Sequence, residues 1–269
     1  RAHAAYDDVI QAISGIAAVQ GGTGAPSYVR SPIADKTVAL MGLSAILGAL
    51  FERARTGAGQ AIEVPMFESM AAFMLLEQQG GRVFEPPIGD VGYARTDSPY
   101  RRPYRTADGH LGVVVYTDRQ WRSFFDLIGR PELATDPRFH TIKERTENID
   151  ELYQLVEAAL LERPSDEWRE EFESAGIAAV PVLGVADLLE DRHLRAVGFF
   201  DDVEHPTEGR LRVARYPVSS SAGPAPRVRP APRLGEHTSE VLREFGFAED
   251  EASRLIARGV VGARDDATG

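Results

Sequence analysis

The sequence contains no cysteine, which excludes disulfide bonds, thiolate metal sites and a cysteine nucleophile. Its six histidines are scattered, and none forms a pair with the spacing of an HExxH motif, so no metal site is expected. An uninterrupted run of about 18 apolar residues is also absent, and no signal peptide is visible, so no membrane span is indicated. We therefore expect a cytoplasmic protein.

Positive charge is outnumbered by negative charge, with 30 lysines and arginines against 41 aspartates and glutamates. The formal net charge is -11 and there is no long basic run, which argues against a nucleic-acid partner. An anionic ligand would then need a local cluster of arginines or backbone N–H groups. With 269 residues, of which 43% are hydrophobic and 26% charged, the chain has the composition of a soluble globular protein of one or two domains.

The stretch from residue 31 to residue 55 predicts the longest helix of the chain. Pro32 stands just before it, Asp35 falls in its first turn, and Gly57 follows as a stop signal. One side of this helix is apolar and a second side carries small residues that would let another backbone approach closely. The two sides comprise Leu40, Leu43, Leu47 and Leu50, and Ala39, Gly42, Ala45 and Ala49.

Asp35 allows two interpretations. A carboxylate at a helix N-terminus is most often a cap that accepts hydrogen bonds from unpaired N–H groups and complements the helix dipole. The same position suits a nucleophile, because N-terminal amides would keep the carboxylate ionised and small neighbours would leave room for a substrate. The residues alone do not choose between these two roles.

Hydrophobic periodicity predicts the remaining elements. We expect helices over residues 6–18, 66–79, 118–128, 145–161, 165–175, 236–245 and 249–258. We expect strands over residues 61–65, 104–106, 111–116 and 176–183, and a strand pair within 199–217. Residues 80–103 are rich in proline and glycine and predict a long loop or domain crossing. The dipeptide Asp108-Gly109 predicts a hairpin turn.

Seven segments, in this order and spacing, resemble the family III CoA-transferases of the CaiB/BaiF type. They are YDDVIQAISG (6–15), SPIADKTVALMGLSAILGAL (31–50), RTGAGQAIEVPMFES (55–69), YRTADGHLGVVVYTDRQW (104–121), GRPELATDPRF (129–139), GIAAVPVL (176–183) and LGEHTSEVLREFGF (234–247). The family includes formyl-CoA transferase, carnitine CoA-transferase and α-methylacyl-CoA racemase. Each segment alone is weak, but together they cover nearly the whole chain.

The resemblance implies an α/β fold. The chain resembles the C-terminal two-thirds of a member and lacks the N-terminal portion. Residues 1–85 would be part of a Rossmann-like large CoA-binding domain that includes the long helix. Residues 86–198 would form a smaller α+β domain, and residues 199–269 would return to the large domain with C-terminal helices. Full-length members form an interlocked homodimer.

The resemblance also implies an activity, namely movement of CoA from an acyl-CoA thioester to a small carboxylic acid through an aspartyl-acyl anhydride. Asp35 stands where the family has its nucleophilic aspartate. Residues Ala4, Ala5, Tyr6 and Asp7 correspond to a segment that contacts CoA. No cofactor is implied beyond coenzyme A itself as substrate and product.

Two departures bear on the kind of reaction. Racemases of the family carry a histidine where this chain has Tyr6 and a glutamate where it has Thr117, so both positions argue for transfer over racemisation. An acyl-CoA racemase or epimerase remains the alternative within the family. A truncated non-catalytic fragment, or a subunit that depends on a separate N-terminal polypeptide, is a further alternative.

A third departure bears on the substrate. The glycine-rich loop of formyl-CoA transferase is absent, and the segment 89–104 stands in its place, which puts specificity for oxalate in doubt. Arg95, Arg101 and Arg102 in or beside this segment are candidates for binding a substrate carboxylate or the CoA phosphates. The competing interpretation is that these arginines are merely solvated.

Overall fold

The computed structural model describes residues 5–223 and 229–263. The chain divides into two compact units, Arg1–Val182 and Leu183–Gly269. The predicted domain boundaries after residues 85 and 198 stay predictions. Within the first unit, two separate hydrophobic clusters lie in residues 10–70 and 104–177.

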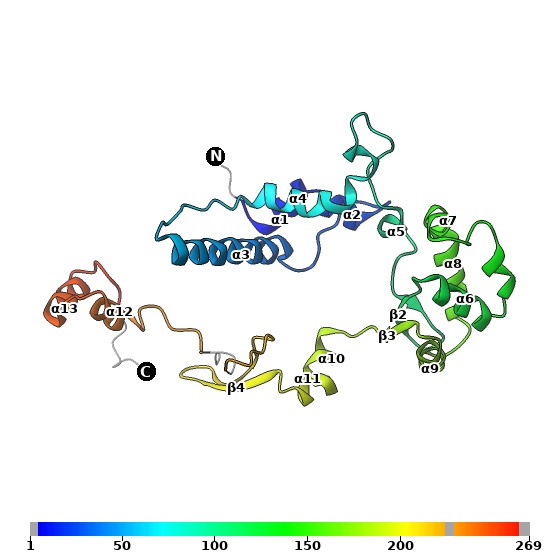
Figure 1. The fold of residues 1–269 in the computed structure, drawn as a ribbon. Coiled ribbons are helices and arrows are strands. Elements are labelled where there is room, and N and C mark those ends of the chain that lie inside the picture. The colour runs from blue at the N-terminus through cyan, green and yellow to red at the C-terminus, as the bar shows by residue number, and fades with distance from the viewer. Residues whose placement is uncertain (1–4, 224–228, 264–269) are drawn as a thin grey trace. The chain divides into compact units, whose positions relative to one another are not determined.

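The N-terminal part of the first unit is helical (Figure 1). It contains α1 (Asp7–Ile13), α2 (Ile16–Gly21), α3 (Ile33–Thr56) and α4 (Met66–Gln78). The prediction of α3 is confirmed, and Gly57 ends it in the left-handed conformation with φ 77°. The single helix predicted over residues 6–18 is wrong, because Gly15 at φ 90° separates α1 from α2.

A small core holds these helices together. α1 packs against both α3 and α4, and α3 packs against α4. The buried members of this core are Ile10, Ile16, Ala34, Val38 and Met70. The strand predicted over residues 61–65 is wrong: no other described strand pairs with this segment, and Val64 packs against the helical core instead.

Most of α3 beyond its first two turns is exposed. By length and composition α3 is the one described helix able to cross a membrane, with a mean hydropathy of 1.5 and 11% of the tested window buried. The sequence has no uninterrupted apolar run of this length, because polar residues such as Ser44 lie within the apolar part of α3. Core helices of water-soluble proteins often have the same length and composition.

The proline- and glycine-rich segment after α4 contains two short helices, η1 (Gly80–Val83) and α5 (Ala94–Asp97). Gly81 packs so closely on Gly89 that a Cβ atom on Gly81 would clash with the Gly89 backbone. The Gln78 side chain, at the end of α4, donates hydrogen bonds to Thr96 Oγ1 (3.1 Å) and Asp97 Oδ1 (3.0 Å). These contacts fix the loop and place α5.

The rest of the first unit is a small α+β region. Its antiparallel sheet has the order β1–β2–β3, with β1 (Tyr104–Arg105), β2 (His110–Val114) and β3 (Ala178–Pro181). The predicted hairpin through Asp108-Gly109 is confirmed. Its helices are α6 (Asp118–Leu127), η2 (Pro131–Thr135), α7 (Ile142–Glu147), α8 (Ile149–Leu160) and α9 (Ser165–Ala175). Asn148 interrupts the helix predicted over 145–161 and separates α7 from α8.

Aromatic side chains fill the core of this region. Trp121, Phe124, Phe125, Trp168 and Phe172 are almost completely buried. Trp168 stacks on Phe172 with ring centroids 5.1 Å apart, and Trp121 meets Phe124 edge to face at 5.9 Å. The aromatic stripe predicted for residues 118–128 is therefore the face that α6 buries.

The second unit has its own elements. α10 (Val185–Glu190) and α11 (Arg192–Ala196) precede an antiparallel pair of strands, β4 (Phe200–His205) and β5 (Gly209–Ala214). α12 (Thr238–Glu244) and α13 (Glu249–Ala257) follow and pack on each other. The predicted strand pair and both terminal helices are confirmed.

The described chain thus mixes helices with two antiparallel sheets. A parallel sheet of the Rossmann kind is absent from residues 5–223 and 229–263. Assignment of residues 1–85 to a Rossmann-like domain stays a prediction.

Candidate active site and anion pocket

The first turn of α3 is capped by another helix. Pro32, at the N-cap position of α3, makes no side-chain capping hydrogen bond. The carboxylate of Asp7, in the first turn of α1, accepts hydrogen bonds from the backbone N–H groups of Ala34 (2.8 Å) and Asp35 (3.0 Å). Asp7 therefore satisfies two of the unpaired donors at the start of α3.

Asp7 is held in place by a buried amide. Gln11, fully buried one turn along α1, donates from Nε2 to Asp7 Oδ2 at 2.6 Å and accepts from the Val29 N–H at 2.9 Å. Partial burial acts to raise the pKa of Asp7, but the hydrogen bonds from Gln11, Asp35 and Ala34 and the charge of Lys36 outweigh it and lower this pKa. Asp7 is thus held ionised at the helix start.

Asp35 lies in the first turn of α3, and its side chain does not cap that helix. Its side chain is exposed, and its carboxylate makes none of the hydrogen bonds or ion pairs found among the residues that the structure describes. Asp7 supplies the cap that the sequence allowed for Asp35. The Asp35 carboxylate is therefore available to a ligand at the positive end of a 24-residue helix.

The predicted CoA-contact segment, residues 4–7, ends at Asp7, the first residue of α1. Ala4 lies outside the described residues. Ala5 and Tyr6 are exposed, and Tyr6 stands immediately before α1 without a side-chain cap bond. Both carboxylate oxygens of Asp7 serve the internal contacts given above. CoA binding by these residues stays a prediction.

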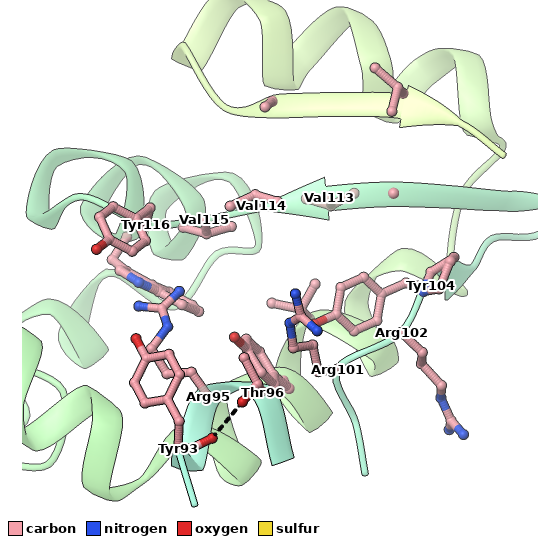
Figure 2. Close-up of a pocket in the computed structure, with 17 residues that line it drawn as sticks. Tyr93, Arg95, Thr96, Arg101, Arg102, Tyr104, Val113, Val114, Val115 and Tyr116 are labelled. Atoms are coloured by element: carbon pink, nitrogen blue, oxygen red, sulfur yellow. Dashed lines mark hydrogen bonds between the residues drawn. The ribbon is translucent and has the colours of Figure 1, made fainter. Parts of the chain in front are cut away.

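A cavity of about 650 Å³ lies in the small α+β region. The loop that carries Tyr93, Arg95 and Arg101 forms one part of its lining, and the β2 segment through Tyr116 forms another (Figure 2). The cavity brings together all three arginines singled out in the sequence, including Arg102. Sequence analysis missed its aromatic lining, of which Tyr93, Tyr116 and Tyr153 are members.

The three arginines differ in their partners. The guanidinium of Arg102 forms an ion pair with Glu157 at 2.6 Å. The guanidinium of Arg95 lies over the ring of Tyr116, 4.6 Å from its centroid. Arg101 has no carboxylate within ion-pair distance among the described residues, and neither has Arg95.

Tyr104 closes the inner wall of the cavity. Its ring is buried and meets that of Tyr153 edge to face at 6.5 Å. Burial, with the nearby Tyr153 and Glu157, raises the pKa of Tyr104 above its usual value of 10.0. Tyr104 therefore stays a neutral hydroxyl at physiological pH.

Thr117, which the resemblance places where racemases carry a glutamate, has a structural role in this chain. Its side chain accepts a hydrogen bond from the Gln120 N–H at 3.2 Å, and Gln120 Oε1 accepts from the Thr117 N–H at 3.0 Å. This reciprocal arrangement is a capping box for α6.

Comparison with known proteins decides the family. The model of CoA-transferase family III matches residues 1–238. The chain belongs to this family. The formyl-CoA:oxalate CoA-transferase of Streptomyces avermitilis is 30% identical in an alignment that covers 96% of this chain and 67% of that protein. The mouse succinyl-CoA:glutarate CoA-transferase is 26% identical, over 96% of this chain and 60% of that protein.

Solved structures agree with this family assignment. A CaiB/BaiF family protein from Brucella suis superposes with a TM-score of 0.66 and 27% identity, covering 90% of this chain and 63% of that one. A variant of Rv3272 from Mycobacterium tuberculosis has a TM-score of 0.74 at 23% identity and shares the fold, covering 89% of this chain and 63% of that one. The chain thus spans about 60–67% of the length of the proteins named here.

Proposed function

We propose that the protein is an acyl-CoA:carboxylate CoA-transferase in which Asp35 is the nucleophile. The observation that carries this proposal is that Asp7 caps the start of α3 while Asp35 does not. Asp7 satisfies the N–H groups of Ala34 and Asp35, so the Asp35 carboxylate stays exposed and unpaired among the described residues. The relatives transfer CoA between acids such as formate and oxalate, or succinate and glutarate, as their names state.

The proposed chemistry balances without a cofactor. An oxygen of Asp35 bonds to the thioester carbonyl carbon, the C–S bond breaks, and CoA leaves as a thiolate. The acceptor carboxylate attacks the Asp35 carbonyl carbon of the resulting anhydride, which releases the donor acid and forms a second anhydride. The thiolate then attacks the acceptor's acyl carbon, which forms the new thioester and restores the Asp35 carboxylate.

Several features of the whole enzyme stay within this proposal. Because the chain spans only part of its relatives, we propose CoA binding near Ala5 and Tyr6, assembly into an interlocked homodimer and residence in the cytoplasm for the whole protein. The racemase alternative lacks support from the site, since Tyr6 and Thr117 replace the expected acid/base residues and Thr117 caps α6.

Intact-mass spectrometry tests the nucleophile. The chain is incubated with a panel of acyl-CoA thioesters and then with hydroxylamine, beside Asp35→Ala. The matched control is Asp8→Asn, which changes another exposed first-turn carboxylate, in α1. We expect an adduct of the acyl mass that hydroxylamine converts to a hydroxamate at position 35, lost in Asp35→Ala and kept in Asp8→Asn.

The same incubation on a chain extended to the length of the relatives separates a wrong assignment from an incomplete enzyme. An adduct that forms only in the extended chain would identify the present chain as a non-catalytic fragment. Absence of an adduct from both forms would remove Asp35 from the reaction.

A further inference from the structure

The outer face of the β2–β3 pair is apolar. The register pairs Gly112 with Val180 and Val114 with Ala178, and these four residues line the cavity together. Val114 is 56% exposed and Val180 is 61% exposed. A sheet that packs one face on a core usually presents polar side chains on the other face. An apolar outer face beside a cavity instead marks a place where a ligand binds.

The same cavity is lined by three arginines. Figure 2 shows the guanidinium of Arg102 turned away from those of Arg95 and Arg101. Arg102 is neutralised by Glu157, whereas Arg95 and Arg101 have no carboxylate partner among the residues the structure describes. In a chain of net charge -11, these two guanidinium groups give the cavity a local positive charge that suits an anion.

We propose that this cavity binds an organic monocarboxylate whose apolar body is longer than the carbon chain of oxalate or glutarate. The carboxylate contacts Arg101 and Arg95, and the apolar body lies on the face formed by Gly112, Val114 and Val180. Its identification as a substrate of CoA transfer rests on the proposed function. The binding itself does not.

The size and lining of the cavity select this class of ligand. Its volume of about 650 Å³ is typical of pockets for small organic molecules. Oxalate has no methylene group to place on an apolar wall, and it would leave most of the cavity unfilled. Each methylene group that leaves water adds roughly fourfold in affinity, so a longer chain is favoured.

Titration calorimetry on the full chain tests binding directly. The probes are octanoate, glutarate, oxalate, the uncharged octan-1-ol and adenosine 3′,5′-bisphosphate, which represents the phosphate end of CoA. We expect octanoate to bind more tightly than the two dicarboxylates and octan-1-ol. A dependence on Arg101 seen only with the bisphosphate would overturn the proposal and assign the site to CoA phosphates.

Variants assign the binding to the cavity. Arg101→Gln removes a charge-assisted hydrogen bond and should weaken octanoate binding by roughly 10- to 100-fold. Arg130→Gln is the matched control, since Arg130 is paired with Glu132 and does not line the cavity, and should leave binding unchanged. Gly112→Phe should abolish binding by filling the cavity, and the milder Val114→Asn should weaken it. Asp35→Asn should bind octanoate normally.

The outcomes separate this proposal from the transfer chemistry. If Asp35→Asn still binds octanoate but no longer forms the acyl adduct, the carboxylate site is supported. That result holds whether or not the reaction proceeds through an anhydride. The proposal is wrong if folded chain, as judged by tryptophan fluorescence, binds no octanoate. It is equally wrong if Arg101→Gln and Val114→Asn bind octanoate as the unaltered chain does.

Discussion

Asp7 Oδ1 lies 3.0 Å from the backbone nitrogen of Asp35, so the helix that carries the proposed nucleophile is capped by a residue 28 positions earlier in the chain. A cap from another helix has a chemical advantage over a local one. It fixes the position of the α3 N-terminus relative to α1 and leaves the Asp35 carboxylate unoccupied. One aspartate thus positions the backbone that carries the other.

Replacement of Asp7 by alanine should open the first turn of α3. The variant loses the hydrogen bonds to Ala34 and Asp35 and leaves Gln11 Nε2 without its shortest partner, which should destabilise this turn by about 1–2 kcal/mol. Amide hydrogen exchange at Ala34 and Asp35 measures this local free energy. Asp8→Ala is the control and should change it little; equal effects of the two variants would contradict the assigned cap.

The contribution of Asp7 should depend on pH. Its pKa is lowered in the folded chain, so its stabilisation is fully present above the unfolded value near 3.8 and is lost as the pH falls through the lower folded value. The difference in exchange protection between unaltered chain and Asp7→Ala should therefore be constant above about pH 5 and shrink below pH 3.8. A difference that shrinks between pH 5 and pH 7 would contradict this.

Arg145 should matter far more than Arg138 to the small α+β region. Arg145 is buried and donates to the carbonyls of Phe139 (2.9 Å) and His140 (3.2 Å) and to Asp118. Arg145→Met leaves two carbonyls without this donor and should destabilise the region by about 2–4 kcal/mol. Arg138 is half exposed, so solvent screens its ion pairs and their loss should destabilise the region far less.

Tryptophan fluorescence measures the stability of the small α+β region in the Arg145→Met and Arg138→Met variants. The chain has two tryptophans, Trp121 and Trp168, and both lie in the core of the small region. Urea unfolding followed by their emission therefore reports this core rather than the whole chain. Equal shifts of the midpoint for Arg145→Met and Arg138→Met would contradict the role given to the buried guanidinium.

Two glycines should respond in opposite ways to alanine. A Cβ on Gly81 would clash with the backbone of Gly89, so Gly81→Ala should loosen the loop before α5 and speed tryptic cleavage after Arg82. Gly48 lies within α3, and the space that a Cβ atom would occupy there is open. Gly48→Ala should therefore stabilise that helix by about 0.5–1 kcal/mol. Unchanged cleavage in Gly81→Ala would show that the close packing does not hold the loop.

The sequence predicted local elements well where one signal dominated. The apolar length of α3 with its glycine stop, the Asp108-Gly109 hairpin and the aromatic stripe of α6 are all confirmed. The strand expected at residues 61–65 failed because alternation alone cannot show whether a partner strand exists. Hydrophobic periodicity also failed to show that the helix is interrupted at Gly15. A right-handed helix cannot continue through the positive φ that this glycine adopts.

The site was harder to predict because its residues are distant in sequence. Asp35 was identified through a resemblance and a helix start, but no local pattern links Asp7 to the cap of a helix that begins 26 residues later. Likewise, the sequence singled out three arginines without showing that Glu157 neutralises Arg102 alone. Such pairings depend on tertiary packing, which periodicity does not encode.

The last prediction concerns the proton next to the thioester carbonyl. Racemisation must remove and return this α-proton, which requires acid/base groups on both faces of the carbon, whereas transfer through Asp35 leaves it in place. By the family resemblance, Tyr6 and Thr117 are expected where racemases carry a histidine and a glutamate, and Thr117 is engaged by Gln120. With a 2-methylacyl-CoA in D₂O, we therefore expect thioester exchange with an added acid but no deuterium at the α-carbon by mass spectrometry. Deuterium uptake that is lost in Asp35→Ala would instead favour the racemase branch.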